Sequence, residues 1–147
     1  MVKGKNRYFL MEIHCENSLK NLTQQSMRKD ILNSIEENFG IFGYACVITS
    51  LNVKYLNAHT NTAIIRVNHK YFQMLQQALT LLRTMDGKVC MLRTLHIAGT
   101  IKSCQKKLME YDKKYLLFTY ERLPNDYEKK KLVKKFIEQY KLKEKRM

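Results

Sequence analysis

The sequence contains no tryptophan, only one proline and only five glycines in 147 residues. Disordered chains are typically poor in apolar residues and rich in proline and polar residues, whereas 45% of this chain is hydrophobic. The composition therefore excludes a disordered protein and predicts about one folded domain. A chain of this length buries enough surface to fold without the support of disulfide bonds.

Long hydrophobic runs are also absent. No segment approaches the roughly 18 consecutive apolar residues of a membrane-spanning helix. The apolar run from Tyr8 to Met11 ends at Glu12 and is too short for the hydrophobic region of a signal peptide. The sequence therefore predicts a cytosolic or nuclear protein.

Motifs for metal binding and nucleophilic catalysis are missing as well. The four cysteines show no Cys-x-x-Cys pair, and their spacing fits neither a zinc ribbon nor a zinc knuckle; they are Cys15, Cys46, Cys90 and Cys104. No His-Glu-x-x-His pattern occurs among the four histidines, and none has a recognisable nucleophile beside it. We expect reduced cysteines, no metal site and no catalytic centre.

Acidic residues are scarce, with 13 Asp and Glu against 27 Lys and Arg, so the formal net charge is +14 and the pI is about 9.7. A charge of this size says nothing about the fold, but it points to a polyanionic partner. Nucleic acid and an anionic membrane surface are the two leading candidates at this point.

The hydrophobic patterns alternate between strand and helix periods. Strands are expected at residues 7–13, 46–56, 62–68 and 89–98, and helices at residues 23–39, 71–85 and from 100 onward. The order strand, helix, strand, strand, helix, strand is that of the split βαβ arrangement. The sequence therefore predicts an α+β fold, a ferredoxin-like or RRM-like βαββαβ sandwich. Its four-stranded antiparallel sheet carries helices on one face, and further helices follow at the C-terminus.

The only proline lies in the segment Leu123-Pro124-Asn125-Asp126, which reads as a linker. We expect a domain over residues 1–122 and a basic amphipathic tail over residues 123–147. From Tyr127 onward the tail holds nine basic residues against three acidic ones. Such a helix can lie on a membrane, dock on a partner, bind RNA, or pack its apolar stripe against the domain.

Two groups of cations stand out before the tail. Lys3, Lys5 and Arg7 alternate, so they share one side of an extended chain and suit successive phosphates, unless this segment is simply solvated. Lys54 and Arg66 lie within otherwise apolar strands and predict a basic open face of the sheet, for RNA or for a protein partner. Residues 62–68 lack the aromatic signature of RNA-recognition motifs, so we expect no base stacking on that strand.

The sharpest local feature is Gly99-Thr100-Ile101-Lys102. Thr100 is a candidate N-cap, Gly99 allows close approach of a ligand, and Lys102 adds charge to the positive end of a helix. The arrangement suits a phosphate, although an ordinary capped helix has the same pattern. Arg93 and Lys106 lie nearby, around the fourth expected strand and the helix that follows it.

Four blocks of sequence resemble a known family in the same order. They are Val2-Lys3-x-Lys5-x-Arg7-Tyr8 with Glu12; Val53-Lys54-Tyr55-Leu56-Asn57-Ala58-x-Thr60; Ile64-Ile65-Arg66; and Thr94-Leu95-His96-Ile97-Ala98-Gly99-Thr100-Ile101-Lys102-x-Cys104-Gln105-Lys106. The chain resembles, as far as about Leu117, the processing-of-precursor-five family of small protein subunits of ribonuclease P and RNase MRP. We expect no match to the family in the basic tail, from about Leu123 onward.

The resemblance implies an RRM-like, non-catalytic subunit of a ribonucleoprotein whose RNA performs the hydrolysis. The complex removes the 5′ leader of precursor tRNA, and the MRP particle processes precursor ribosomal RNA. Partners implied are the RNase P RNA and MRP RNA, a second small RRM-like subunit and a barrel-folded subunit of about thirty kilodaltons. No cofactor is implied for the protein, Mg²⁺ being expected on the RNA. The implied location is the nucleus, largely the nucleolus.

The resulting hypothesis is an RNA-binding subunit rather than an enzyme or a membrane protein. The expected RNA-binding residues are Lys3, Lys5, Arg7, Lys54, Tyr55, Arg66, Arg93, Gly99, Thr100, Lys102 and Lys106. The alternative is a ferredoxin-fold adaptor that binds only proteins within such a particle.

Overall fold

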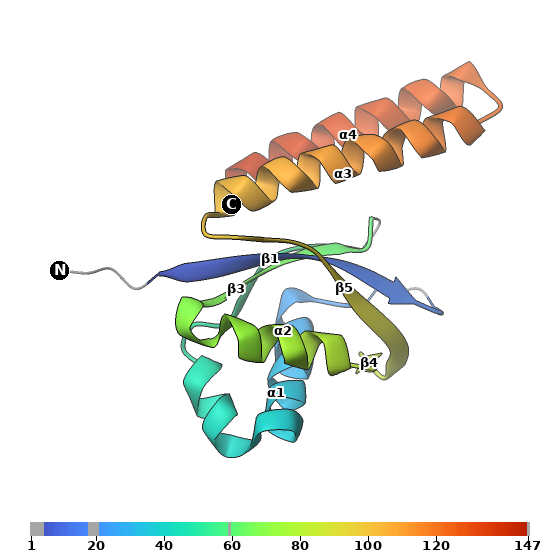
Figure 1. The fold of residues 1–147 in the computed structure, drawn as a ribbon. Helices are drawn as coiled ribbons and strands as arrows, with labels where there is room; N and C mark the ends of the chain where they lie inside the picture. Colours follow the sequence, from blue (N-terminus) through green and yellow to red (C-terminus); the bar gives the residue numbers. More distant parts are fainter. Residues whose placement is uncertain (1–4, 18–20, 59, 147) are drawn as a thin grey trace. The chain divides into compact units, whose positions relative to one another are not determined.

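One sheet of five strands organises the fold, in the order β2-β3-β1-β5-β4 (Figure 1). The computed structural model describes residues 5–17, 21–58 and 60–146, with side chains as far as residue 138. The strands are β1 (Asn6–Cys15), β2 (Asn52–Asn57), β3 (Thr62–Asn68), β4 (Thr84–Met85) and β5 (Lys88–Ala98). All neighbouring strands in this sheet pair antiparallel.

The expected α+β fold is confirmed, but the prediction of four strands is wrong. The fifth strand, β4, is only two residues long and pairs with the start of β5. Asp86 and Gly87 connect the two strands with positive φ angles of 54° and 72°. Positive φ at both central residues is what a tight two-residue hairpin requires, so this Asp-Gly turn creates the extra strand.

Helices α1 (Gln24–Val47) and α2 (Phe72–Leu81) cover one face of the sheet, with the short 3-10 helix η1 (His69–Tyr71) before α2 (Figure 1). Met27, Ile31 and Ile35 of α1 recur every four residues, as expected of one helical face, and they are buried against this face of the sheet. Alternate residues of β1 and β3 meet it from the sheet side. The core formed in this way contains, among others, Phe9, Met11, Ile13, Met27, Ile31, Ile35, Ala63, Ile65, Val67, Leu75 and Leu79.

Helix α1 begins with a capping box. The backbone N–H of Ser26 donates to Thr23 Oγ1 at 3.1 Å, and the backbone N–H of Thr23 donates to Ser26 Oγ at 3.0 Å. Two of the backbone donors that a helix start leaves without a partner are therefore satisfied.

Replacing Thr23 by alanine is expected to lower the free energy of unfolding by about 0.5–2 kcal/mol, since the cap is lost. Urea denaturation followed by circular dichroism measures the change. Thr49→Ala is the matched control, because Thr49 is exposed and lies outside the helices and strands. An equal loss in both variants would contradict the role of the cap.

The C-terminal half of α1 departs from the prediction. A strand was expected from Cys46, but the helix continues through a kink at Gly40, where φ is 72°, as far as Val47. Arg28 then fixes the turn that follows, donating to the carbonyl oxygens of Ile48 at 2.6 Å and Leu51 at 3.0 Å. The alternating pattern begins to act as a strand only at Asn52.

Two further helices, α3 (Ile101–Arg122) and α4 (Asp126–Arg146), complete the chain. The chain forms two compact units, Met1–Gln105 and Lys106–Met147. Within the second unit, the rings of Tyr115 and Phe136 lie 6.3 Å apart between their centroids, and Asn125 Oδ1 accepts from the backbone N–H of Tyr127 at 3.1 Å. The expected division at residues 122 and 123 stays a prediction.

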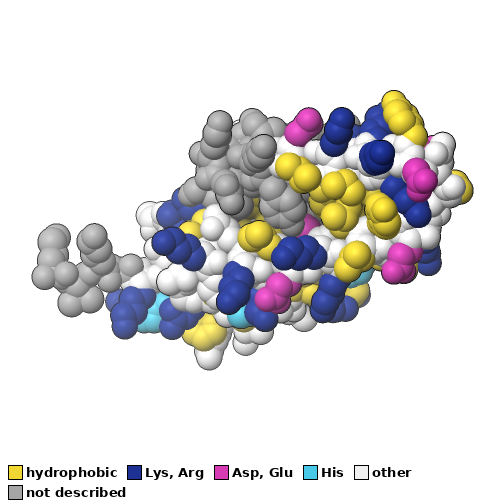
Figure 2. All heavy atoms as spheres, turned by 90° about the horizontal axis from the view of Figure 1, so that it is seen from above, with side chains coloured by type: hydrophobic (Ala, Val, Ile, Leu, Met, Phe, Trp, Pro, Cys, Tyr) yellow, Lys and Arg dark blue, Asp and Glu magenta, His cyan; other side chains and the backbone are white. Residues whose placement is uncertain are grey.

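The second unit exposes large apolar side chains among its many cations. Figure 2 shows hydrophobic side chains gathered between Lys and Arg side chains. The most exposed on α3 and α4 are Leu117, Phe118, Tyr127 and Ile137. The Arg122 guanidinium lies 4.0 Å above the ring of Phe118. Within the described residues, no helix is both long enough and apolar enough to cross a membrane.

Candidate nucleic-acid interface

The start of β1 and the start of α3 meet at one corner of the sheet. Because Tyr8 pairs with Ala98, the preceding Arg7 lies beside Gly99. A Cβ atom added to Gly99 would lie 3.3 Å from Arg7 Nη1, so the guanidinium rests close to the glycine. Arg7 Nη1 also donates to the carbonyl oxygen of Asn6 at 3.4 Å. Two positions that are 92 residues apart in the sequence therefore form one site.

Helix α3 presents its positive end at this corner. Thr100 Oγ1 accepts from the backbone N–H of Ser103 at 3.3 Å, as expected of an N-cap. The first turn of α3 contains no acidic residue, and both Gly99 and Lys102 are exposed. Backbone N–H groups, the helix dipole and the Lys102 ammonium together make a region that favours anions such as phosphate.

Two contacts fasten the first turn of α3 to the sheet. The Cys104 thiol donates to the carbonyl oxygen of Tyr8 at 3.3 Å, and Ser103 Oγ lies 3.3 Å from His96 Nε2. Burial raises the pKa of Cys104 to about 11, although a hydrogen bond with the backbone of Ala98 acts in the opposite direction. The thiol therefore keeps its proton at neutral pH and remains a donor.

Arg66 lies one strand away from this corner. It pairs with Tyr8 on β1 and with Asn52 on β2, and it faces away from α1 and α2 because its neighbours Ile65 and Val67 lie in the core. Its Nε atom is buried and has no hydrogen-bond partner among the described residues. A buried guanidinium nitrogen without a partner is costly, so an external acceptor would stabilise it.

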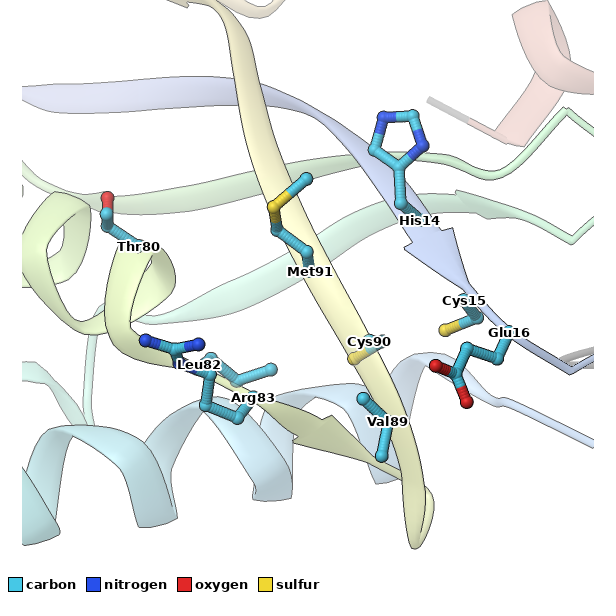
Figure 3. A pocket seen from close by; sticks show the side chains of 9 residues that line it. All are labelled: His14, Cys15, Glu16, Thr80, Leu82, Arg83, Val89, Cys90 and Met91. Carbon is cyan, nitrogen blue, oxygen red and sulfur yellow. The ribbon is translucent and has the colours of Figure 1, made fainter.

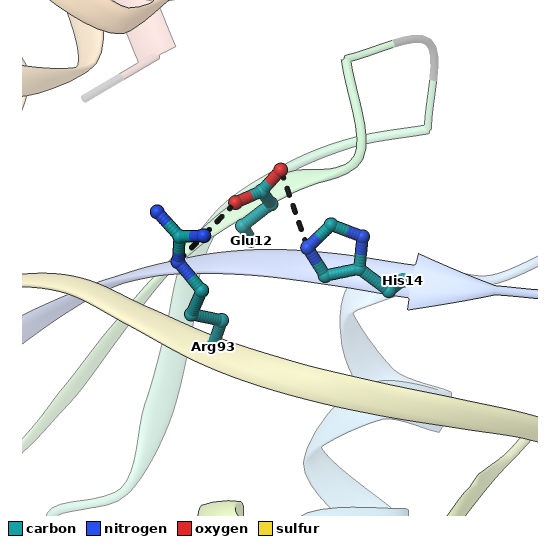
Figure 4. Close-up of polar contacts among 3 residues, drawn as sticks. All are labelled: Glu12, His14 and Arg93. Carbon is teal, nitrogen blue, oxygen red and sulfur yellow. Dashed lines mark ion pairs between the residues drawn. The ribbon is translucent and has the colours of Figure 1, made fainter.

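Other predicted residues lie elsewhere in the first unit. Lys54 is half-exposed at a register shift in β2, and Tyr55 is only 6% exposed. Arg93 lies on β5, with its Nε 3.8 Å from a Glu12 carboxylate oxygen, and His14 Nε2 lies 3.3 Å from the other oxygen (Figure 4). The charge of Arg93 is therefore partly compensated by Glu12.

Three predicted cations remain to be placed, and they are Lys3, Lys5 and Lys106. Lys5 is exposed, immediately before β1, and Lys106 is exposed on α3. Lys3 lies outside the described residues. The structure thus brings together Arg7, Gly99, Thr100 and Lys102 at the corner, with Lys5 two residues before Arg7, while Lys54 and Arg93 lie away from them.

One cation of this region has no motif in the sequence. Lys70, on η1, is exposed, and the neighbouring His69 donates its backbone N–H to the carbonyl oxygen of Lys5 at 2.9 Å. The pairing of Asn6 with Asn68 brings these two segments together. Only the strand register reveals this neighbour, because Lys70 follows a different strand from the one that Lys5 precedes.

Comparison with known proteins now identifies the family. Residues 7–109 match the model of the Rpp14/Pop5 family. The chain belongs to the Rpp14/Pop5 family. The resemblance predicted from the four sequence blocks is thereby confirmed, and the matched region runs from Arg7 on β1 into α3. It includes the corner described above and ends before α4.

Relatives in the Rpp14/Pop5 family cover most of the chain. The human ribonuclease P/MRP protein subunit POP5 is 30% identical over an alignment of 143 positions, which covers 91% of this chain and 86% of the relative. Because residues 1–122 make up less than 91% of the chain, this alignment extends into the basic tail, and the expectation that the tail matches nothing is wrong. The POP5 subunit of Schizosaccharomyces pombe is 33% identical over 124 residues, covering 77% and 89%. Ribonuclease P protein component 2 of Pyrococcus horikoshii is 32% identical over 108 residues, covering 74% and 86%.

A solved structure supports the family's fold. A chain in a cryo-EM structure of yeast ribonuclease MRP superposes with a TM-score of 0.50 at 18% identity, covering 78% of this chain and 95% of that chain. At this identity the likeness concerns the fold alone.

Proposed function

We propose that this protein is a non-catalytic subunit of the ribonuclease P and RNase MRP ribonucleoproteins, where it binds and stabilises the catalytic RNA. One observation carries the proposal beyond family membership. Arg7, Lys102 and the positive end of α3 meet at one corner, where the first turn of the helix has no acid. Such a corner attracts closely spaced phosphates.

In this proposal the protein acts by neutralising charge. Its cations allow phosphates of the folded RNA to approach one another, and the Mg²⁺ ions that serve the hydrolysis stay on the RNA. The reaction is then removal of the 5′ leader from precursor tRNA, and processing of precursor ribosomal RNA in the MRP particle. The names of the human and S. pombe relatives, subunits of both enzymes, support this assignment.

The proposal also includes partners and a place in the cell. We infer a second small RRM-like subunit and a barrel-folded subunit as neighbours, and a nuclear, largely nucleolar location. The four long strands lie in the order β2-β3-β1-β5, which supports a ferredoxin-like, RRM-like arrangement for this subunit.

A second candidate is an adaptor that contacts only proteins. The exposed apolar side chains of α3 and α4, such as Leu117 and Phe118, favour it, because apolar surface is what protein partners bury. In that case the cations of the first unit serve solubility.

Purification of the tagged chain from cells, with and without exhaustive nuclease treatment, distinguishes the two. We expect ribonuclease P and MRP RNAs among the sequenced bound RNAs. We also expect nuclease to remove some, but not all, of the co-purifying subunits. Full retention of every subunit, with no enriched RNA, would support the adaptor instead. Cleavage of precursor tRNA by the isolated chain without RNA would contradict both.

A further inference from the structure

Two cysteines lie directly opposite each other, one at the end of β1 and the other near the start of β5. Cys15 pairs with Cys90. The backbone N–H of Cys90 donates to the carbonyl oxygen of Arg83 at 2.8 Å, and therefore points away from β1. The backbone N–H of Ile13, two residues before Cys15, donates to the carbonyl oxygen of Asn61 at 2.8 Å and points away from β5. The direction of the backbone N–H repeats every second residue along a strand, so the N–H of Cys15 also points away from β5.

These hydrogen bonds identify Cys15 and Cys90 as a non-hydrogen-bonded pair of the antiparallel ladder. In such pairs the Cα atoms lie about 4.5 Å apart and the side chains are at their closest. Disulfides form across Cα separations of about 4.4–6.8 Å. The backbone therefore already holds the two cysteines at a separation that a disulfide accepts.

A pocket of about 470 Å³ gives access to the pair. Its lining includes both cysteines, together with His14, Glu16, Arg83 and Met91 (Figure 3). The Cys15 sulfur points toward the strand that carries Cys90 (Figure 3). Cys15 is half-buried, whereas Cys90 is only 5% exposed. A reagent that enters the pocket therefore reaches Cys15 first.

We propose that Cys15 and Cys90 form a redox-sensitive dithiol, which closes into a disulfide between β1 and β5 when a small anionic disulfide such as glutathione disulfide enters the pocket. The exposed Arg83 guanidinium suits the carboxylates of that reagent. In a reducing compartment the dithiol is the resting state, and the disulfide forms under oxidation. This inference does not depend on the proposed role in ribonuclease P.

The exchange has two balanced steps. The Cys15 thiolate attacks one sulfur of glutathione disulfide, which forms a mixed disulfide and releases one glutathione thiolate. The Cys90 thiol then loses its proton, and its sulfur attacks the Cys15 sulfur, forms the Cys15–Cys90 bond and releases the second glutathione thiolate. The two protein thiols lose two electrons, glutathione disulfide gains them, and the two thiol protons pass to the released thiolates.

The environment of the thiols supports this order of attack. Burial raises the pKa of Cys15, but the neighbouring Cys90 thiol and Lys88 oppose the rise. Burial and the neighbouring Cys15 raise the pKa of Cys90 to about 12. Cys15 is therefore the more available nucleophile, and Cys90 is the one that resolves the mixed disulfide.

Peptide mapping by mass spectrometry tests the proposal on the full chain. After incubation with excess glutathione disulfide, we expect a peptide pair joined through Cys15 and Cys90, lighter by two hydrogen atoms than the reduced pair and reversed by dithiothreitol. Glutathione held at Cys15 without closure, disulfides only between chains, or faster reaction at Cys46 would overturn the proposal.

Two variants check the order of the steps. Cys90→Ala is expected to abolish the internal disulfide and to retain glutathione on Cys15, whereas Cys15→Ala is expected to leave Cys90 unmodified in the folded chain. Cys46→Ser is the matched control, because Cys46 is also half-buried and lies in α1, away from the pair. If glutathione is found on Cys90 in the Cys15→Ala variant and the circular dichroism is unchanged, the assignment of the first attack to Cys15 is wrong.

Discussion

Replacement of Phe9 by alanine is expected to lower the free energy of unfolding by about 3–5 kcal/mol. Phe9 has none of its surface exposed and lies on the central strand β1, between Ile65 of β3 and Ile97 of β5. Truncation leaves a cavity where both helices meet the sheet, and the neighbouring side chains can fill it only in part. Single domains are stable by only about 5–15 kcal/mol, so the variant loses a large fraction of its stability.

Phe42→Ala is the matched control for this prediction. The same side chain is removed, but Phe42 is 77% exposed, so a change within about 0.5 kcal/mol is expected. Urea denaturation followed by circular dichroism gives both values under identical conditions. Comparable losses in the two variants would mean that the centre of the core is not at β1.

Segments with one strong period were predictable from the sequence. The spacing of Met27, Ile31 and Ile35 predicts one helical face, and these three residues lie in the core. The strand expected over residues 62–68 is β3 with the same bounds. In both cases local pattern and tertiary burial require the same structure, so the sequence alone is sufficient.

The segment after Gly40 was not predictable in the same way. Short apolar stretches such as residues 46–51 fit either a strand or the last turn of a helix. Gly40 kinks α1 without ending it, and Arg28, some 20 residues earlier, holds the carbonyl of Ile48. This contact between residues 20 positions apart helps to determine that the segment forms the end of a helix and a turn rather than a strand, and no local sequence pattern indicates it.

The candidate interface was also predictable only where a local sequence pattern determines the structure. The motif Gly99-Thr100 predicts the helix start, and Thr100 caps α3 as expected. The approach of Arg7 to Gly99 and the position of Lys70 near Lys5 depend on the register of β1 with its neighbours. One sequence contains the residues of the corner but not the pairing that assembles them.

Replacing Lys5, Arg7 and Lys102 together by alanine is expected to have the largest effect on RNA binding. If each cation neutralises one phosphate, the slope of log affinity against log salt concentration falls in magnitude by about 0.7–0.9 per lost contact, or by about 2.1–2.7 for the triple variant. Between about 1 M and about 0.1 M salt, the affinity of the triple variant therefore rises about 100- to 500-fold less than that of the unchanged chain. Filter binding to ribonuclease P RNA over a salt series measures both quantities.

A second triple variant separates contact from overall charge. Helix α4 exposes Lys130, Lys131 and Lys134. Replacing these three lysines by alanine removes as many positive charges as the first triple variant does. Electrostatic attraction over distances beyond the Debye length of about 10 Å is largely screened at about 0.1 M salt, so only cations near phosphates change the slope strongly. We therefore expect a smaller loss of affinity for the α4 variant and a slope close to that of the unchanged chain.

The corner variant must also retain its fold for the comparison to hold. None of its three side chains belongs to the core, and Lys5 and Lys102 are exposed, so circular dichroism and the urea midpoint are expected to change little. With folding preserved, the difference between the two slopes reports phosphate contacts at the corner of β1 and α3. Equal slopes for the two triple variants would show that the RNA recognises the net charge of the chain, and the corner would lose its assigned role.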